Sequence, residues 1–124
     1  MEVLVARPAA DVSVVTIRGQ LDMDSAGALR AALDKLRADS VSRIVADLHD
    51  LTFCDSIGLS TLVLTHRYCV SVGGWLRLAD PTPFLTRLLA LVGISNVVPV
   101  YQGVDGALAG DPADLFQGFG EVKL

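Results

Sequence analysis

The sequence predicts a single α/β domain, with a mostly parallel central sheet of about five strands, an opening hairpin and about four covering helices. Short β-rich apolar runs alternate along the chain with longer runs whose apolar residues recur every three or four positions. The first two β-rich runs are separated only by a short turn, which favours a hairpin. With 124 residues that are 52% hydrophobic, the chain is long enough for one domain with a sizeable core.

The chain opens with two predicted strands, residues 2–6 and 12–18, which are rich in β-branched side chains. Residues 8–11 are turn-like, so the two strands are expected to pair as a hairpin. Gly19 is expected to end the second strand.

An amphipathic helix is predicted next, and it ends near residues 39–40. Either Asp24 or Ser25 is expected to cap its start. Its apolar face consists of Ala26, Leu29, Ala32, Leu33 and Leu36. A short strand at residues 44–46 follows, and the order strand, helix, strand implies a parallel crossover.

A loop at residues 48–55 leads into a second predicted helix, residues 57–72, which ends at the Gly73–Gly74 pair. The apolar stripe of this helix is expected to contain Leu59, Leu62, Val63, His66 and Val70.

The C-terminal half repeats the pattern. A strand is predicted at residues 75–79, then a helix that starts at residues 80–83 and stops at Gly93. Residues 97–101 form a further strand, which contains a proline and is therefore expected at an edge. Residues 104–109 are weakly helical.

We expect the domain to span residues 1–110 and residues 111–124 to form a C-terminal extension. The extension contains glycine, proline and aspartate but also Phe116 and Phe119. A flexible tail and a docking segment are both compatible with this composition.

The overall charge excludes several classes of function. A net charge of −4 and a pI near 4.9 argue against nucleic acid binding and against a polybasic membrane-surface module. No apolar run approaches the roughly 18 residues of a membrane span, and the first residues lack a signal-peptide pattern. We therefore expect a cytoplasmic protein, in which Cys54 and Cys69 are free thiols.

Ser56 is the most informative residue, because it lies where a strand and loop give way to a helix. The N-terminus of a helix has unpaired N–H groups and a positive dipole end. The Ser56 hydroxyl could therefore cap the helix, or it could carry a phosphate that the helix terminus tolerates. A phosphate beside Asp55, and near Asp22 and Asp24, would add like charge to a binding face.

Enzymatic and metal-dependent functions have little support in the sequence. Neither GxxxxGK[ST] nor GxGxxG occurs. A Ser-His-Asp site could recruit Ser56 with His49 or His66, but Ser56 is not in a GxSxG elbow. The candidate metal ligands Asp22, Asp24, Asp47, His49, Asp50 and Asp55 come from three segments without a known spacing. We expect no catalytic residue, no metal and no cofactor.

The stretch from Asp47 to Leu59 reads Asp-Leu-x-x-Leu-Thr-Phe-x-Asp-Ser-x-Gly-Leu. It resembles the central motif of STAS domains, specifically of the bacterial anti-sigma factor antagonists. Residues 19–22, Gly73–Gly74 and residues 88–94 are similar to the flanking family pattern, so that the resemblance spans most of the domain.

The resemblance implies a protein that is not an enzyme. Such proteins bind an anti-sigma factor that is also a serine kinase, and so release a sigma factor. The kinase uses ATP and Mg²⁺ to phosphorylate the serine matching Ser56, and a serine phosphatase restores binding. The implied partner-binding residues are Asp22, Asp24, Asp55, Ser56, Ile57, Gly58 and Leu59.

Two residues depart from the family pattern. Ile57 replaces a small polar residue, and Cys54 replaces an aliphatic residue or methionine. Neither change removes the hydroxyl, but Ile57 adds an apolar contact that could alter partner choice. The alternative is an accessory or scaffold subunit of a membrane transport or signalling assembly, in which Ser56 only caps the helix.

Overall fold

Strands β1 (Glu2–Ala9) and β2 (Val12–Leu21) form the predicted antiparallel hairpin in the computed structural model, which describes residues 1–116. β1 is longer than expected. It continues through part of the predicted turn to Ala9, which pairs with Val12 beyond an irregularity that starts at Ala6. Pro8 is tolerated there because β1 is the edge strand of the sheet.

The rest of the main sheet is parallel, as predicted. Its strand order is β1-β2-β3-β5-β6, in which β3 (Arg43–Asp47) and β5 (Trp75–Ala79) are central and β6 (Val100–Tyr101) forms the far edge. The carboxyl ends of the parallel strands therefore lie along one edge of the sheet, which is where binding sites of α/β sheets usually occur.

The predicted end of β2 and the predicted 48–55 loop are both wrong. β2 does not stop at Gly19 but continues to Leu21, with its register shifted between Gly19 and Gln20. The positive φ of 93° at Gly19 accommodates this irregularity. Beyond it, β2 pairs with an additional strand, β4 (Leu51–Cys54). Only the pairing with β2 makes this short segment a strand.

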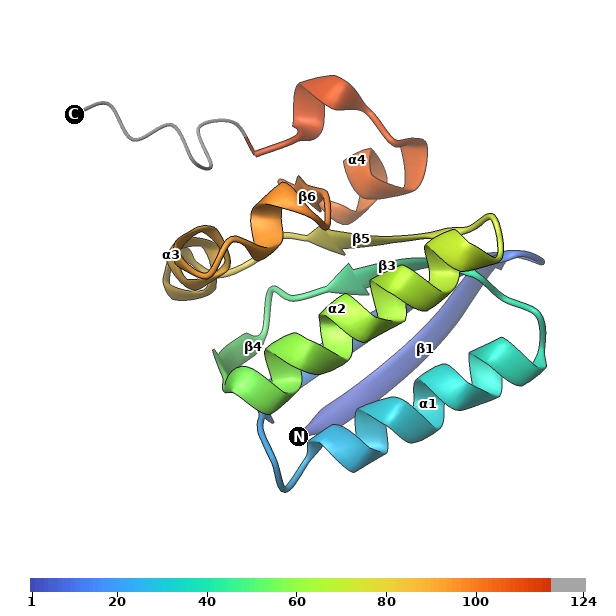
Figure 1. The fold of residues 1–124 in the computed structure, drawn as a ribbon. Helices are drawn as coiled ribbons and strands as arrows, with labels where there is room; N and C mark the ends of the chain where they lie inside the picture. Colours follow the sequence, from blue (N-terminus) through green and yellow to red (C-terminus); the bar gives the residue numbers. More distant parts are fainter. Residues whose placement is uncertain (117–124) are drawn as a thin grey trace.

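Residues 1–116 contain four α-helices: α1 (Ala26–Ala38), α2 (Ser56–Ser71), α3 (Pro83–Leu91) and α4 (Val104–Ala109). Two short 3-10 helices, Ile94–Asn96 and Pro112–Asp114, follow α3 and α4. Helices α1 and α2 lie side by side on one face of the sheet (Figure 1), where Ile44 and Ala46 of β3 contribute to the main core. Val45 points to the other face and packs with Ala107 of α4 in a smaller cluster. None of the helices in residues 1–116 is long and apolar enough to cross a membrane.

The buried stripe of α2 differs from the prediction at one position. Leu59 and Leu62 are buried as expected, but Val70 is exposed and Cys69 is fully buried in its place. Apolar residues occur on both sides of this helix, so the sequence pattern alone does not identify the buried side. His66 is half-buried, and its Nδ1 is buried without a hydrogen-bond partner among the described residues.

The first residues after the predicted domain boundary pack against the sheet edge. Leu115 forms an antiparallel bridge with Tyr101, and the N–H of Phe116 donates to the carbonyl of Val100 at 2.9 Å. Phe119 lies outside the described residues. The role of residues 111–124 as an extension stays a prediction.

Candidate functional site

Asp55, and not Ser56, caps helix α2. Asp55 has an extended backbone (φ −90°, ψ −176°), and its Oδ1 accepts from the Gly58 N–H at 2.9 Å. Ser56 is the first residue of the helix, and its side chain is exposed. Its carbonyl accepts from the Ser60 hydroxyl, but its own hydroxyl makes no hydrogen bond within residues 1–116. The capping role considered for Ser56 is therefore incorrect, and its hydroxyl is available to a partner.

Asp55 also joins α2 to the loop between β2 and α1. Its second carboxylate oxygen, Oδ2, accepts from the Met23 N–H at 3.0 Å, and its own N–H donates to the Leu21 carbonyl at 3.1 Å. One carboxylate thus fixes two segments that are 32 positions apart in sequence. This brings Ser56 and the residues after Leu21 to one end of the sheet.

The loop before α1 is ordered by Asp22. Its Oδ1 accepts from the N–H groups of Asp24 and Ser25 at 3.0 and 3.1 Å. Ser25 occupies the N-cap position, but its side chain makes no capping bond, so the expected cap by Asp24 or Ser25 is not observed. Asp22 is half-buried, and Asp24 is exposed. Asp24 therefore adds negative charge to the surface of this loop.

Gly58 and Leu59 lie beneath this surface. A Cβ on Gly58 would be 2.7 Å from Cys54 Sγ and 2.9 Å from the Leu21 carbonyl oxygen, so only glycine allows α2 to approach β2 this closely. Leu59 is buried in the core. These two residues shape the site from below, whereas Ser56, Ile57 and Asp24 are exposed on it.

Two exposed apolar side chains next to these residues were not predicted. Met23 is 70% exposed and Phe53 is 42% exposed, compared with 40% for Ile57. Met23 stands between two aspartates, and Phe53 belongs to the motif itself. The exposure of Met23 could have been predicted, because an apolar residue stands there between two aspartates. The exposure of Phe53 could not, because it depends on strand β4, which was not predicted. Together, Met23, Phe53 and Ile57 give this end of the molecule an apolar surface.

A groove of about 480 Å³ runs between α1 and α2. Ser56 and Ile57 line it at the beginning of α2, and Tyr68 and Cys69 line it near the end. Its α1 side carries the charged side chains Arg30, Asp34 and Arg37. Ser56 therefore lies at one end of a groove that has both apolar and charged residues along it.

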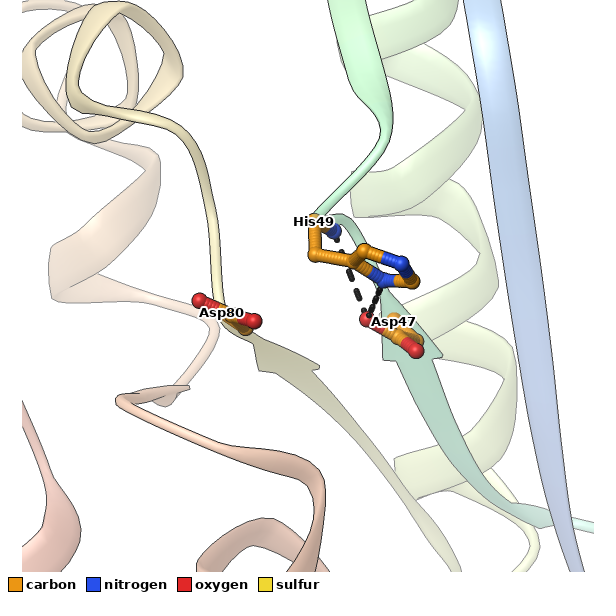
Figure 2. A group of neighbouring side chains, drawn as sticks. All are labelled: Asp47, His49 and Asp80. Carbon is orange, nitrogen blue, oxygen red and sulfur yellow. Dashed lines mark hydrogen bonds and ion pairs between the residues drawn. The ribbon is translucent and has the colours of Figure 1, made fainter.

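A separate polar cluster lies at the ends of β3 and β5. Figure 2 shows Asp47, His49 and Asp80, whose ligand atoms all lie within 4.8 Å of one another. This arrangement could accept a divalent cation, but both ring nitrogens of His49 already contact carboxylates. Nδ1 lies 2.9 Å from Asp47, and Nε2 lies 3.0 Å from Asp50. The hydrogen bond to Asp47 is the largest cause of a raised His49 pKa, which favours the imidazolium form.

The side chains around Ser56 do not form a nucleophilic site. No histidine contacts the Ser56 hydroxyl in the described part of the chain. Burial, and secondarily the negative charge of Asp55, raises the pKa of the Cys54 thiol to about 12, so this cysteine stays protonated and unreactive. What the site offers is an exposed hydroxyl between carboxylates and apolar side chains.

Comparisons with known proteins identify the family of the chain. The model of the STAS domain matches residues 4–107. The chain is 29% identical to an anti-sigma F factor antagonist of Paenibacillus polymyxa over 78% of this chain and 84% of that protein. It is 30% identical to an anti-sigma-B factor antagonist of Bacillus subtilis (strain 168), over 76% of this chain and 85% of that protein.

Solved structures show the same fold. The crystal structure of an anti-sigma factor antagonist from Mycobacterium paratuberculosis is 32% identical, with a TM-score of 0.78 over 88% of this chain and 92% of that chain. The Bacillus cell fate determinant SpoIIAA in its phosphorylated form is 19% identical, with a TM-score of 0.70 over 88% of this chain and 98% of that chain. The family match and these relatives show that the chain belongs to the STAS domain family.

Proposed function

We propose that this protein is an anti-sigma factor antagonist. In this proposal it acts in the cytoplasm, binds an anti-sigma factor that is a serine kinase, and releases a sigma factor. Phosphorylation of Ser56 switches it off, and a serine phosphatase switches it on again. The proposal is supported by relatives of similar length that carry this name, and one related fold has been solved in a phosphorylated form.

The single observation that carries the proposal is the free hydroxyl of Ser56. Asp55 already supplies the cap of α2, so the fold has no structural need for a hydroxyl at Ser56. A kinase could reach this side chain without unwinding the helix. In the transfer, the Ser56 oxygen bonds to the γ-phosphorus of ATP, the bond to the β-phosphate oxygen breaks, ADP leaves, and the hydroxyl proton passes to a base of the kinase.

The same surface explains how a phosphate would act. A phosphoserine adds about −1.5 to −2 charge at neutral pH, here next to Asp55 and close to Asp24. Ile57, Met23 and Phe53 offer apolar contact area for a partner, and a doubly charged group on the neighbouring Ser56 would have to lose its water when the partner covers it. The phosphate would therefore block association and leave the fold intact.

Intact mass measurement with peptide mapping, on protein purified from its own host, tests the modification. We expect a fraction heavier by one phosphate at Ser56. Binding to the host's anti-sigma factor kinases then tests the switch. Ser56→Ala should bind permanently in the presence of ATP, and Ser56→Asp should bind at least tenfold more weakly, an effect of about 1.4 kcal/mol.

Ser71→Asp is the matched control, since it adds the same charge at the exposed far end of α2. Equal binding by Ser56→Asp and the wild-type protein would refute the charge switch. A stable stoichiometric complex that survives ATP, with Ser56 unmodified, would instead identify an accessory or scaffold subunit of a transport or signalling assembly.

A further inference from the structure

Arg30 shares the groove between α1 and α2 with Ser56. The two helices lie side by side and run in the same direction, so that their first turns are at the same end of the groove (Figure 1). Arg30 belongs to the second turn of α1, and Ser56 and Ser60 to the first two turns of α2. All three line the groove. Arg30 is therefore on the α1 side of the groove, and the proposed phosphorylation site is on its α2 side.

Arg30 differs from most arginines of the described chain because it has no recorded ion pair or ring contact. Three others pair with aspartates, namely Arg7 with Asp39, Arg18 with Asp50 and Arg43 with Asp11. Arg37 and Arg77 lie over the rings of Tyr68 and Trp75. Asp34 follows Arg30 by one helical turn on the same rim, yet the two do not pair within 4 Å. An exposed guanidinium without a carboxylate can accept an anion at little cost.

Most of the other charged side chains around Ser56 in the described chain are carboxylates. Asp55 precedes it directly, Asp22 and Asp24 lie in the neighbouring loop, and Asp34 is on the α1 rim. A phosphate on Ser56 would repel all four carboxylates. Arg37 is two turns farther along α1, and its guanidinium is already stacked on Tyr68. Arg30 is thus the cation best placed to neutralise the phosphate.

We propose that Arg30 binds the phosphate group of phosphorylated Ser56 across the mouth of the groove. This inference rests on the proposed function of Ser56 and adds a residue to it. The guanidinium can donate two parallel hydrogen bonds to phosphate oxygens, and the N-terminus of α2 supports the same charge from the other side. The pair links α1 to α2 and holds the phosphate over the groove next to Ile57.

The test uses the full chain with phosphoserine installed at position 56 by genetic code expansion, so no kinase is needed. Phosphorus-31 NMR follows the second ionisation of the phosphate. We expect Arg30→Ala to move the titration midpoint to higher pH by roughly 0.2 to 0.7 pH unit, the range of an exposed ion pair. Arg30→Lys should retain part of the effect. Arg37→Ala, on the same rim, is the matched control and should leave the midpoint unchanged.

Equal midpoints for Arg30→Ala and the wild-type sequence would overturn the pairing, and so would an equal shift in Arg37→Ala. Both results would leave the proposed function standing, because that depends on whether Ser56 is phosphorylated in its host. Conversely, if Ser56 were unmodified in the host, the proposed switch would be refuted. The titration midpoint of the installed phosphoserine would still show whether Arg30 binds the phosphate. Since Arg30 is exposed, its substitution should not unfold the protein, and circular dichroism checks this.

Discussion

Helices α2 and α3 both follow strands of the sheet directly, but their first residues differ in chemistry. In α3, the Thr82 hydroxyl accepts from the Leu85 N–H at 3.2 Å, and proline occupies the first helical position. In α2, the Asp55 carboxylate accepts from the Gly58 N–H, and serine occupies the first helical position. The hydroxyl before α3 thus caps the helix, whereas the hydroxyl at the beginning of α2 makes no hydrogen bond in the described chain.

This difference indicates which of the first residues of α2 and α3 are explained by folding alone. Proline at the first helical position is favoured because its φ is fixed and its missing N–H is not needed there. A serine gives no such advantage, and the hydroxyl of Ser56 makes no hydrogen bond in the described chain. Folding therefore accounts for Thr82, Pro83 and Asp55 but not for Ser56. This difference is the physical argument that supports the proposed role of Ser56.

The largest expected effect concerns the close approach of α2 to β2. Gly58→Ala should lower the free energy of unfolding by roughly 1–3 kcal/mol, because the new Cβ meets the Leu21 backbone, which cannot move easily. Gly27→Ala in α1 is the control, since nothing lies within 4 Å of its Cβ; it should stabilise the protein by about 0.5–1 kcal/mol. Urea unfolding measures both, and similar values for the two variants would contradict the packing described.

The two caps should differ in strength. Asp55→Ala removes the acceptor for Gly58 and also the link to Met23, and we expect a loss of about 2 kcal/mol, at the upper end for a cap. Thr82→Ala removes one capping bond and should cost about 1 kcal/mol. Chemical denaturation of both variants tests the order. A smaller loss for Asp55→Ala would mean that its bond to the neighbouring loop contributes nothing.

The first helical position of α2 should tolerate proline, which is the residue that α3 has at this position. Ser56→Pro should leave the stability unchanged or raise it by up to about 1 kcal/mol, because the extended backbone of Asp55 suits a following proline. Ser60→Pro, one turn later, is the control and should cost about 3 kcal/mol or more. Thermal unfolding compares them. If Ser56→Pro were as damaging as Ser60→Pro, the serine would have a structural role after all.

The smallest effect comes from the turn between β3 and β4. The His49 pKa is raised in the folded protein, chiefly by its hydrogen bond to Asp47. Its contribution is therefore complete below the unfolded pKa of about 6.5 and is lost as the pH rises through the higher folded value. Because His49 is exposed, we expect less than about 1 kcal/mol. The free energy of unfolding of His49→Gln should therefore fall less with pH above about 6.5 than that of the wild-type protein. If both proteins showed the same pH dependence, His49 would not be the cause of this fall.

Most strands and helices could be predicted because periodicity and breakers reflect local physics. Strand β5 has the predicted bounds, and the positive φ of Gly93 after α3 agrees with its predicted role as a stop. Strand β4 and the continuation of β2 past Gly19 were missed, because each exists only through pairing with the other. The exposure of Val70 was missed because an apolar helix has no obvious inner side.

The sequence by itself determined the order of the elements, the STAS motif and the position of Ser56 at the start of a helix. These depend on residues close together in the chain, where spacing, caps and turn residues act. Only the tertiary structure decided that the carboxylate of Asp55 also holds Met23, and that Arg30 and Ser56 line one groove. These arrangements bring together residues that are 32 and 26 positions apart, and no local pattern encodes which carboxylate or guanidinium will lie near them after folding.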